Sequence, residues 1–429
     1  MSNAVSKNMR SVFRFALFGV GRFSGTGLQF AVLALIGYLL GDSALGVFAT
    51  GQSLVVYAGT LASLGLPAFI LRRSATKKSL KSPPTAVWLS VTNTLALGAA
   101  VILSCLSVTY LILSKDNAIG GLPASVVVGL CLGAGAYAIV RTYAESLKGQ
   151  RKLIASTSVE FIFPFVIAML GVMFVAFKPT IFVQYIALML ALGYVFSSLY
   201  CIFIYGSRPR FLSLPRSIRR IRYNIGELIS LHLVQVGNQS LLALPVILAA
   251  ALLTYSDAAV VGVALRLIGL SATATALIIG FWAKDVVMSV RSSDIRKRRQ
   301  VFFKLYIFNF ISQALVLGTV AAFPQFVLSL FSIDVAATSA EASAVRVLAL
   351  LRLARGFFGT PEIFLINAGR SGYDLISHVL ALTVFGLIIV LSGSSLFTIA
   401  LAAGAAGLVR GGISAGLVSA LVLFPRVER

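Results

Sequence analysis

Long apolar runs alternate with short polar connectors along the whole chain. The runs cover residues 12–40, 44–71, 85–113, 123–147, 154–177, 181–205, 224–254, 258–283, 301–323, 342–367, 373–392 and 396–424. About 20 apolar residues suffice for a helix that crosses a bilayer. A membrane β-strand needs only about ten residues and alternates strictly between apolar and polar, which these runs do not. Because the backbone must be hydrogen-bonded within lipid, the pattern predicts an all-α polytopic membrane protein with about 12 transmembrane helices.

The connectors carry a strongly uneven distribution of positive charge. Of the Lys and Arg outside the runs, 25 fall in one set of alternate segments, and only Lys115 and Lys178 fall in the other. Loops rich in Lys and Arg stay on the cytoplasmic side of the membrane. We therefore predict a multi-pass protein of the bacterial inner membrane with both termini in the cytoplasm.

The longest cytoplasmic connector divides the runs into six and six. This predicts an N-terminal six-helix lobe (1–205), a cytoplasmic basic linker (206–223) and a C-terminal six-helix lobe (224–429). Because six is even, a repeat would be parallel rather than inverted. Similar segments open the second and eighth runs, with Asp42 and Gly46 in one and Asp257 and Gly262 in the other. Ordinary chemistry at helix ends is the alternative explanation of this likeness.

Composition supports the membrane assignment and narrows the function. Hydrophobic residues make up 59% of the 429 residues, charged residues make up 11%, and the mean hydropathy is +0.97. Soluble domains are about 45–50% apolar and about 25% charged. The net charge of +23 does not predict nucleic-acid binding, because the basic residues lie in short clusters between apolar runs. With no metal-ligand spacing and no nucleophile motif, the sequence predicts neither an enzyme nor a cofactor.

Five arginines lie deep within the apolar runs, where lipid would be expected. They are Arg22, Arg266, Arg352, Arg355 and Arg410. Each would cost about 2.5–3.5 kcal/mol at the bilayer centre, so they must face water, a partner or a ligand. The carboxylates near or inside the runs are too few to neutralise them. These are Glu145, Glu160, Glu227 and Glu362.

Helical spacing places polar groups on two faces. In a continuous tenth helix, Arg352, Arg355, Gly359 and Glu362 would share one face. In the seventh helix, the expected lining of a polar cavity is His232, Gln235 and Gln239, with Asn238 at its edge. The pattern favours a cationic central cavity for a phosphate or carboxylate substrate, since guanidinium binds such groups through paired donors. Interhelical ion pairs and amide hydrogen bonds that only stabilise the bundle are the alternative.

Four segments carry a family resemblance. Ser63-Leu-Gly65-Leu-Pro67, followed by Arg72 and Arg73, resembles the "LGLP…R" signature of Wzx-like polysaccharide flippases. These flippases belong to the multidrug/oligosaccharidyl-lipid/polysaccharide (MOP) exporter superfamily. The stretch 40–49 is similar to the family's "LGPEEYGLFA" opening, and the basic ends at 149–152 and 369–370 are similar to its "ALGR" endings. The chain departs from the family pattern because no acidic pair follows Gly41.

The resemblance implies a MATE-like fold with two lobes related by a parallel pseudo-twofold and a central cavity. It further implies a transporter that moves an undecaprenyl-pyrophosphate-linked oligosaccharide from the cytoplasmic to the periplasmic leaflet. Such a flippase serves O-antigen, capsule or exopolysaccharide biosynthesis by alternating access. Any of Glu145, Glu160, Glu227 and Glu362 could couple this movement to a proton or sodium gradient. Its expected partners are the lipid-linked oligosaccharide, the lipid bilayer and other polysaccharide-assembly membrane proteins.

Three other functions remain open at the level of sequence. A multidrug exporter of the same superfamily would share the fold, although organic cations favour acidic cavities. A small-anion exporter would also use arginines. A membrane glycan polymerase or ligase is disfavoured, because the longest external loop, near 324–341, is too small for a catalytic domain.

Overall fold

The structure is a computed structural model that describes residues 2–75, 83–114, 118–119, 122–150, 152–177, 185–205, 219, 221–291, 294–336, 338–367 and 371–423. Its first part contains α1 (Ser2–Ala62), α2 (Leu66–Ala75), α3 (Pro83–Ser114), strands β1 (Ala118–Ile119) and β2 (Leu122–Pro123), α4 (Ala124–Gly149), α5 (Leu153–Thr157), the π-helix η1 (Ser158–Ile162), α6 (Phe163–Ala176), α8 (Ile186–Tyr200) and the π-helix η3 (Cys201–Tyr205). The second part contains α10 (Ile225–Leu252), α11 (Tyr255–Arg291), α12 (Ile295–Ala322), α13 (Pro324–Ser329), α14 (Ala340–Gly356), α15 (Pro361–Asn367), α16 (Ser371–Ser392), α17 (Leu396–Val418) and the π-helix η4 (Ser419–Leu423).

The all-α prediction is confirmed. Among the described residues, ten helices are long and apolar enough to cross a membrane. One of them, Gly19–Ala62, covers 44 residues and contains a break at Gly41, so it represents two of the predicted runs. Helices α14 and α15 together fill the predicted tenth run. Strands β1 and β2 are two residues each and form a small antiparallel hairpin.

The chain divides into two compact units. Unit 1 comprises Met1–Leu40 and Thr50–His232, and unit 2 comprises Gly41–Ala49 and Leu233–Arg429. The first six predicted runs therefore fall mainly in unit 1 and the last six in unit 2. Most of the predicted linker 206–223 lies outside the described residues.

The predicted second helix is not continuous, which corrects the sequence-based prediction. Leu64 and Gly65 have positive φ angles of 48° and 74°, and they separate α1 from α2. Gly65 packs against the start of α10, where an added Cβ would lie 2.5 Å from the carbonyl oxygen of Leu228. Only a glycine combines this φ with such a close approach. The Leu-Gly-Leu-Pro segment therefore forms a break within the run.

The predicted tenth helix is also interrupted. Helix α14 ends at Gly356, Gly359 has a φ of 68°, and α15 starts at Pro361. Proline has no N–H for a helical hydrogen bond and restricts the residue before it, so a new helix begins there. Arg352 and Glu362 therefore do not lie on one continuous helix face, although both line the same pocket.

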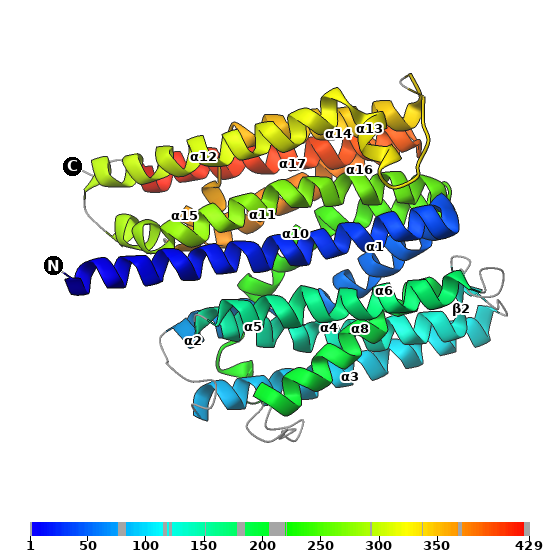
Figure 1. Ribbon diagram of the computed structural model, residues 1–429, viewed down its shortest axis with the longest axis horizontal. Coiled ribbons are helices and arrows are strands. Elements are labelled where there is room, and N and C mark those ends of the chain that lie inside the picture. Colours follow the sequence, from blue (N-terminus) through cyan, green and yellow to red (C-terminus); the bar gives the residue numbers. More distant parts are fainter. Residues whose placement is uncertain are drawn as a thin grey trace. The chain divides into compact units, whose positions relative to one another are not determined.

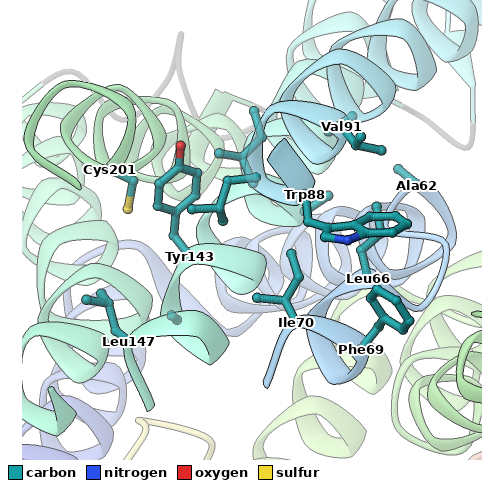
Figure 2. Close-up of a cluster of buried hydrophobic side chains, with 14 of the residues drawn as sticks. Ala62, Leu66, Phe69, Ile70, Trp88, Val91, Tyr143, Leu147 and Cys201 are labelled. Atoms are coloured by element: carbon teal, nitrogen blue, oxygen red, sulfur yellow. The ribbon is translucent and has the colours of Figure 1, made fainter. Parts of the chain in front are cut away.

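The core of unit 1 is an apolar cluster between α2, α3 and α4. Phe69 and Trp88 pack edge to face with ring centroids 4.7 Å apart, and Ile70 and Leu66 are buried beside them (Figure 2). Aromatic pairs in this arrangement add about 0.5–1.5 kcal/mol beyond the apolar area that they bury. The short helix α2 is thus held in place despite the break before it.

Unit 2 is a bundle in which α17 packs against both α14 and α16, and α11 packs against α12 (Figure 1). Glycines permit the closest contacts. A Cβ on Gly46 would overlap the carbonyl oxygen of Tyr255. A Cβ on Gly262 would lie 2.8 Å from the Cβ of Ala49. The two segments that resemble each other in sequence are therefore packed against one another at their glycines.

Candidate functional site

Two packed helices of unit 2 bring three of the predicted arginines together. Arg352 and Arg355 lie on α14, and Arg410 lies on α17. A Cβ on Gly407 would lie 3.0 Å from the guanidinium carbon of Arg352, and one on Gly411 would lie 2.8 Å from Cγ of Arg355. The glycine spacing of α17 therefore leaves room for two long cationic side chains between the helices.

These side chains line a pocket within unit 2. The pocket has a volume of about 250 Å³. Its charged lining is Arg352, Arg355, Arg410 and Glu362, and the other residues come from α10, α11, α12, α17 and the turn before α15. Three guanidinium groups thus share the space with one carboxylate.

The single carboxylate of the pocket contacts only one of the arginines. Nη2 of Arg355 lies 3.4 Å from Oε1 of Glu362. Arg352 donates one long hydrogen bond of 3.4 Å to the carbonyl oxygen of Leu241. Within the described part of the chain, neither Arg352 nor Arg410 forms an ion pair, and the Nε atoms of both are buried without a hydrogen-bond partner.

This arrangement leaves two buried positive charges without a direct ion pair among the described residues. Arg352 and Arg410 are only 5% and 7% exposed. Buried charges are costly unless they are paired and hydrogen-bonded. An anion with several acceptor oxygens would satisfy the free donors and the charge together.

The other two predicted arginines lie elsewhere. Nη1 of Arg266 donates to the carbonyl oxygen of Gly262 in its own helix at 2.9 Å, and Arg266 is outside the pocket lining. Arg22 lies in unit 1, where its guanidinium carbon is 5.5 Å from the ring centroid of Phe161.

The predicted polar face of α10 is only partly in the pocket. Asn238 lines it, whereas Gln235 and Gln239 are half-buried residues outside its lining. His232 belongs to unit 1 and lies against Gly65, with its Nδ1 buried and without a hydrogen-bond partner among the described residues.

Two of the predicted coupling carboxylates form an ion-pair cluster in unit 1. Glu160 lies 2.8 Å from both Arg141 and Lys148, and Glu145 lies 3.5 Å from Arg141 and 2.9 Å from Lys148. Two bases thus neutralise two acids. Glu227 is exposed near the start of α10.

Sequence reasoning missed a buried acid–histidine pair on α16. Asp374 and His378 are 0% and 1% exposed, and Nδ1 of His378 donates to the backbone carbonyl oxygen of Asp374 at 2.8 Å. Oδ1 of Asp374 accepts from Ser377 at 3.3 Å and from Ser414 of α17 at 3.4 Å. The i, i+4 spacing of an acid and a histidine inside an apolar run was the available signal.

Sequence reasoning also missed a neutral polar group at the pocket. Thr275 of α11 and Gln313 of α12 line the pocket and contact Oδ1 of the buried Asn309. Nε2 of Gln313 donates to this oxygen at 3.1 Å, and the Thr275 hydroxyl also lies 3.0 Å from the carbonyl oxygen of Ser271. Their signal was weak, because single Thr, Asn and Gln residues occur in many membrane helices.

Three solved structures that are similar to this chain are two transporters and a flippase. The MATE multidrug transporter DinF-BH, in a ligand complex, has a TM-score of 0.68 at 14% identity, and the match covers 96% of this chain and 97% of that one. The lipid II flippase MurJ in an inward closed conformation has a TM-score of 0.62 at 13% identity, covering 94% and 88%. A MOP superfamily transporter from Pyrococcus furiosus, titled for the reverse polarity of its binding pocket, has a TM-score of 0.58 at 15% identity, covering 94% and 93%.

At these identities the likeness establishes the fold alone. Neither a protein-family model nor a curated protein sequence matches the chain. The chain therefore has the MATE-like fold of MOP superfamily transporters, and the chemistry of its pocket must be argued from its own residues.

Proposed function

We propose that this MATE-like membrane protein is a transporter for an undecaprenyl-pyrophosphate-linked oligosaccharide in bacterial polysaccharide biosynthesis. It moves this lipid from the cytoplasmic to the periplasmic leaflet of the inner membrane. The observation that carries the proposal is the pocket of unit 2, where three arginines face one carboxylate.

Pyrophosphate fits the unmet requirements of this pocket. Arginine presents a planar fork of donors that matches phosphate oxygens, and each guanidinium is permanently charged. Arg352 and Arg410 carry donors without partners among the described residues, so a bound anion gains hydrogen bonds that the free pocket lacks. An organic cation would instead meet two arginines that form no ion pair within the described residues, which disfavours multidrug export through this pocket.

Transport would proceed by alternating access of the pocket to the two leaflets. Coupling to a proton or sodium gradient would act through Glu362, the one predicted coupling carboxylate that lines the pocket. Glu145 and Glu160 are already neutralised by Arg141 and Lys148 and would serve mainly to hold their helices together.

The orientation follows from the charge bias of the connectors. We place both termini in the cytoplasm, together with the faces that would contact other polysaccharide-assembly proteins. Reporter fusions after Ser256 and Gly393 should read periplasmic, and a fusion after Gly149 should read cytoplasmic. Any fusion on the wrong side would contradict this orientation.

The proposal is tested by removing charge from the pocket in cells. Arg352→Ala and Arg410→Ala should give membrane-inserted protein but little surface polysaccharide, and the lipid-linked oligosaccharide should accumulate on the cytoplasmic side. Lysine replacements should restore activity only in part, because an ammonium lacks the planar fork.

A matched control lies on the same helix. Arg346 of α14 donates to the carbonyl oxygen of Ala321 and is outside the pocket lining, so Arg346→Ala should keep its activity. Full activity of both pocket variants would refute the proposal. Loss of the variant proteins from the membrane would show instead that these arginines stabilise the fold.

A further inference from the structure

A buried carboxylate on α16 keeps one oxygen without a hydrogen bond. Asp374 is 0% exposed, and its Oδ1 accepts from Ser377 at 3.3 Å and from Ser414 at 3.4 Å. Its Oδ2 is buried and has no hydrogen-bond partner among the described residues. Asp374 lies in the first turn of α16, where the helix dipole favours a negative charge. The carboxylate is therefore only partly satisfied, and Oδ2 is available to a cation.

The histidine one turn further along α16 does not supply this cation. Nδ1 of His378 lies 3.8 Å from Oδ2 of Asp374, but it donates to the backbone carbonyl oxygen of Asp374 at 2.8 Å. Nε2 of His378 is buried without a partner in the described part of the chain. A protonated ring would bury a second N–H and a positive charge without a hydrogen bond at this nitrogen, which is costly. His378 is therefore neutral in this arrangement.

Arg410 of the neighbouring helix α17 is within electrostatic reach of Asp374. It lies one turn before Ser414, whose hydroxyl contacts the carboxylate. The Cβ atoms of residues four apart on a helix are about 5–6 Å apart. A change of rotamer in the long Arg410 side chain therefore directs its guanidinium toward Oδ2 of Asp374.

The other charged groups around this pair have the wrong sign or are already engaged. Glu362 of α15 interacts electrostatically with Asp374 and with Arg410, but its direct ion pair is with Arg355 at 3.4 Å. Within the described residues, Asp374 and Arg410 are thus a carboxylate and a guanidinium on two packed helices. Each has a buried polar atom without a hydrogen bond, Oδ2 in one and Nε in the other.

We propose that Arg410 alternates between two anions, the phosphate group of the transported lipid and the carboxylate of Asp374. Asp374 competes with the bound phosphate for Arg410 and so promotes release of the substrate. The inference rests on the proposed function and deepens it, because it assigns the release step to a residue outside the pocket lining. Asp374 is a positioning residue, since it acts through Arg410.

Removal of this carboxylate should tighten binding and slow transport. In detergent, full-length Asp374→Asn should bind inorganic pyrophosphate about three- to tenfold more tightly, because more of the protein then has Arg410 free for the ligand. In proteoliposomes the same variant should translocate a lipid-linked pyrophosphate more slowly than the wild type. A carboxylate that only joined α16 to α17 would not raise the affinity when removed.

Three results would contradict the inference or its premise. An affinity of Asp374→Asn equal to or below that of the wild type would overturn the inference and leave the proposed function standing. Tighter binding with unchanged or faster translocation would also overturn it, because release would then not depend on Asp374. Failure of the wild type to bind pyrophosphate would overturn both the inference and the proposed function.

An Arg410→Met background tests whether Asp374 acts through Arg410. There the gain from Asp374→Asn should disappear, since coupled residues are not additive. Glu362→Gln is the matched control, and its gain should remain because Glu362 pairs with Arg355. An equal gain from Asp374→Asn in both backgrounds would show that its charge acts directly on the ligand, which would overturn the inference.

Ser414→Ala gives a reading of opposite sign, also if Asp374→Asn does not fold. It removes the hydroxyl at 3.4 Å from Oδ1, so Asp374 should compete more strongly for Arg410 and pyrophosphate affinity should fall by about twofold. Unchanged or higher affinity would overturn the inference. Asp257→Asn controls for a general effect of lost negative charge, because Asp257 bonds to Thr254 outside the pocket lining. It should keep the wild-type affinity, and a gain equal to that of Asp374→Asn would overturn the inference.

Discussion

Two arginines of the protein should respond in opposite ways to the same substitution. Arg352 is buried and has no carboxylate partner among the described residues, so Arg352→Met removes a charge without exposing another. A buried charge without an ionic partner carries a desolvation penalty that an apolar side chain of similar size does not, and replacing even a buried ion pair by apolar side chains is often neutral or stabilising by about 1–4 kcal/mol. The lost hydrogen bond to Leu241, at 3.4 Å, offsets at most about 1 kcal/mol of this gain.

Arg141 provides the matched comparison in unit 1. It lies 2.8 Å from Glu160 and 3.5 Å from Glu145, so Arg141→Met leaves Lys148 as the one direct ion-pair partner of both carboxylates among the described residues. Breaking a fully buried pair costs about 3–5 kcal/mol. Because the Arg141 side chain is 40% exposed, solvent screening reduces the expected loss to about 1–3 kcal/mol.

Thermal unfolding of the three proteins in one detergent measures the difference. We expect Arg352→Met to unfold at or above the temperature of the wild type and Arg141→Met to unfold clearly below it. The same samples should show that Arg352→Met binds inorganic pyrophosphate roughly tenfold more weakly, as expected for one lost charge-assisted contact. A less stable Arg352→Met than Arg141→Met would refute the view that the pocket arginine is retained for a ligand.

Two further predictions concern the geometry of the pocket. Gly407→Ala places a Cβ 3.0 Å from the guanidinium carbon of Arg352, so pyrophosphate affinity should fall. In Gly412→Ala the new Cβ lies 3.5 Å from the Phe358 ring, so pyrophosphate affinity should stay unchanged. Equal losses of affinity in the two variants, measured by isothermal titration, would contradict this prediction. Glu362→Gln releases Arg355 from its 3.4 Å ion pair, so pyrophosphate affinity should rise. The expected gain is about two- to fivefold, which corresponds to the energy of a partly exposed ion pair. A decrease in affinity would show that Glu362 helps the anion bind.

The helices were predictable because each one needs an apolar segment of bilayer length. Most runs end close to the ends of the observed helices, whereas α1 and α11 continue into the basic segments at Ser2 and Arg291. The interruptions were not predictable from hydropathy. Gly41, Gly65 and Gly359 lie inside or beside apolar runs, and only their positive φ angles reveal the breaks. A single glycine is also common in an intact membrane helix, so its presence alone does not identify a break.

The partners of the charged residues could not be read from the chain either. Arg141 and Glu160 meet because α4 packs beside the segment from α5 to α6, and no sequence spacing expresses that contact. The deep arginines of the sequence include Arg352, Arg355 and Arg410, and the structure brings these three together because α14 and α17 pack against each other. The deep arginines also include Arg266, which bonds to its own helix.

The most direct test of the account is translocation in vesicles of defined lipid that contain only this protein. A fluorescent undecaprenyl-pyrophosphate disaccharide is placed in one leaflet, and its arrival in the other is followed by an impermeant quencher. Wild-type protein should move the lipid, and Arg352→Ala/Arg410→Ala should not, although Arg346→Ala should. Uptake of a fluorescent organic cation by the wild type, with the glycolipid left in its original leaflet, would contradict the central claim.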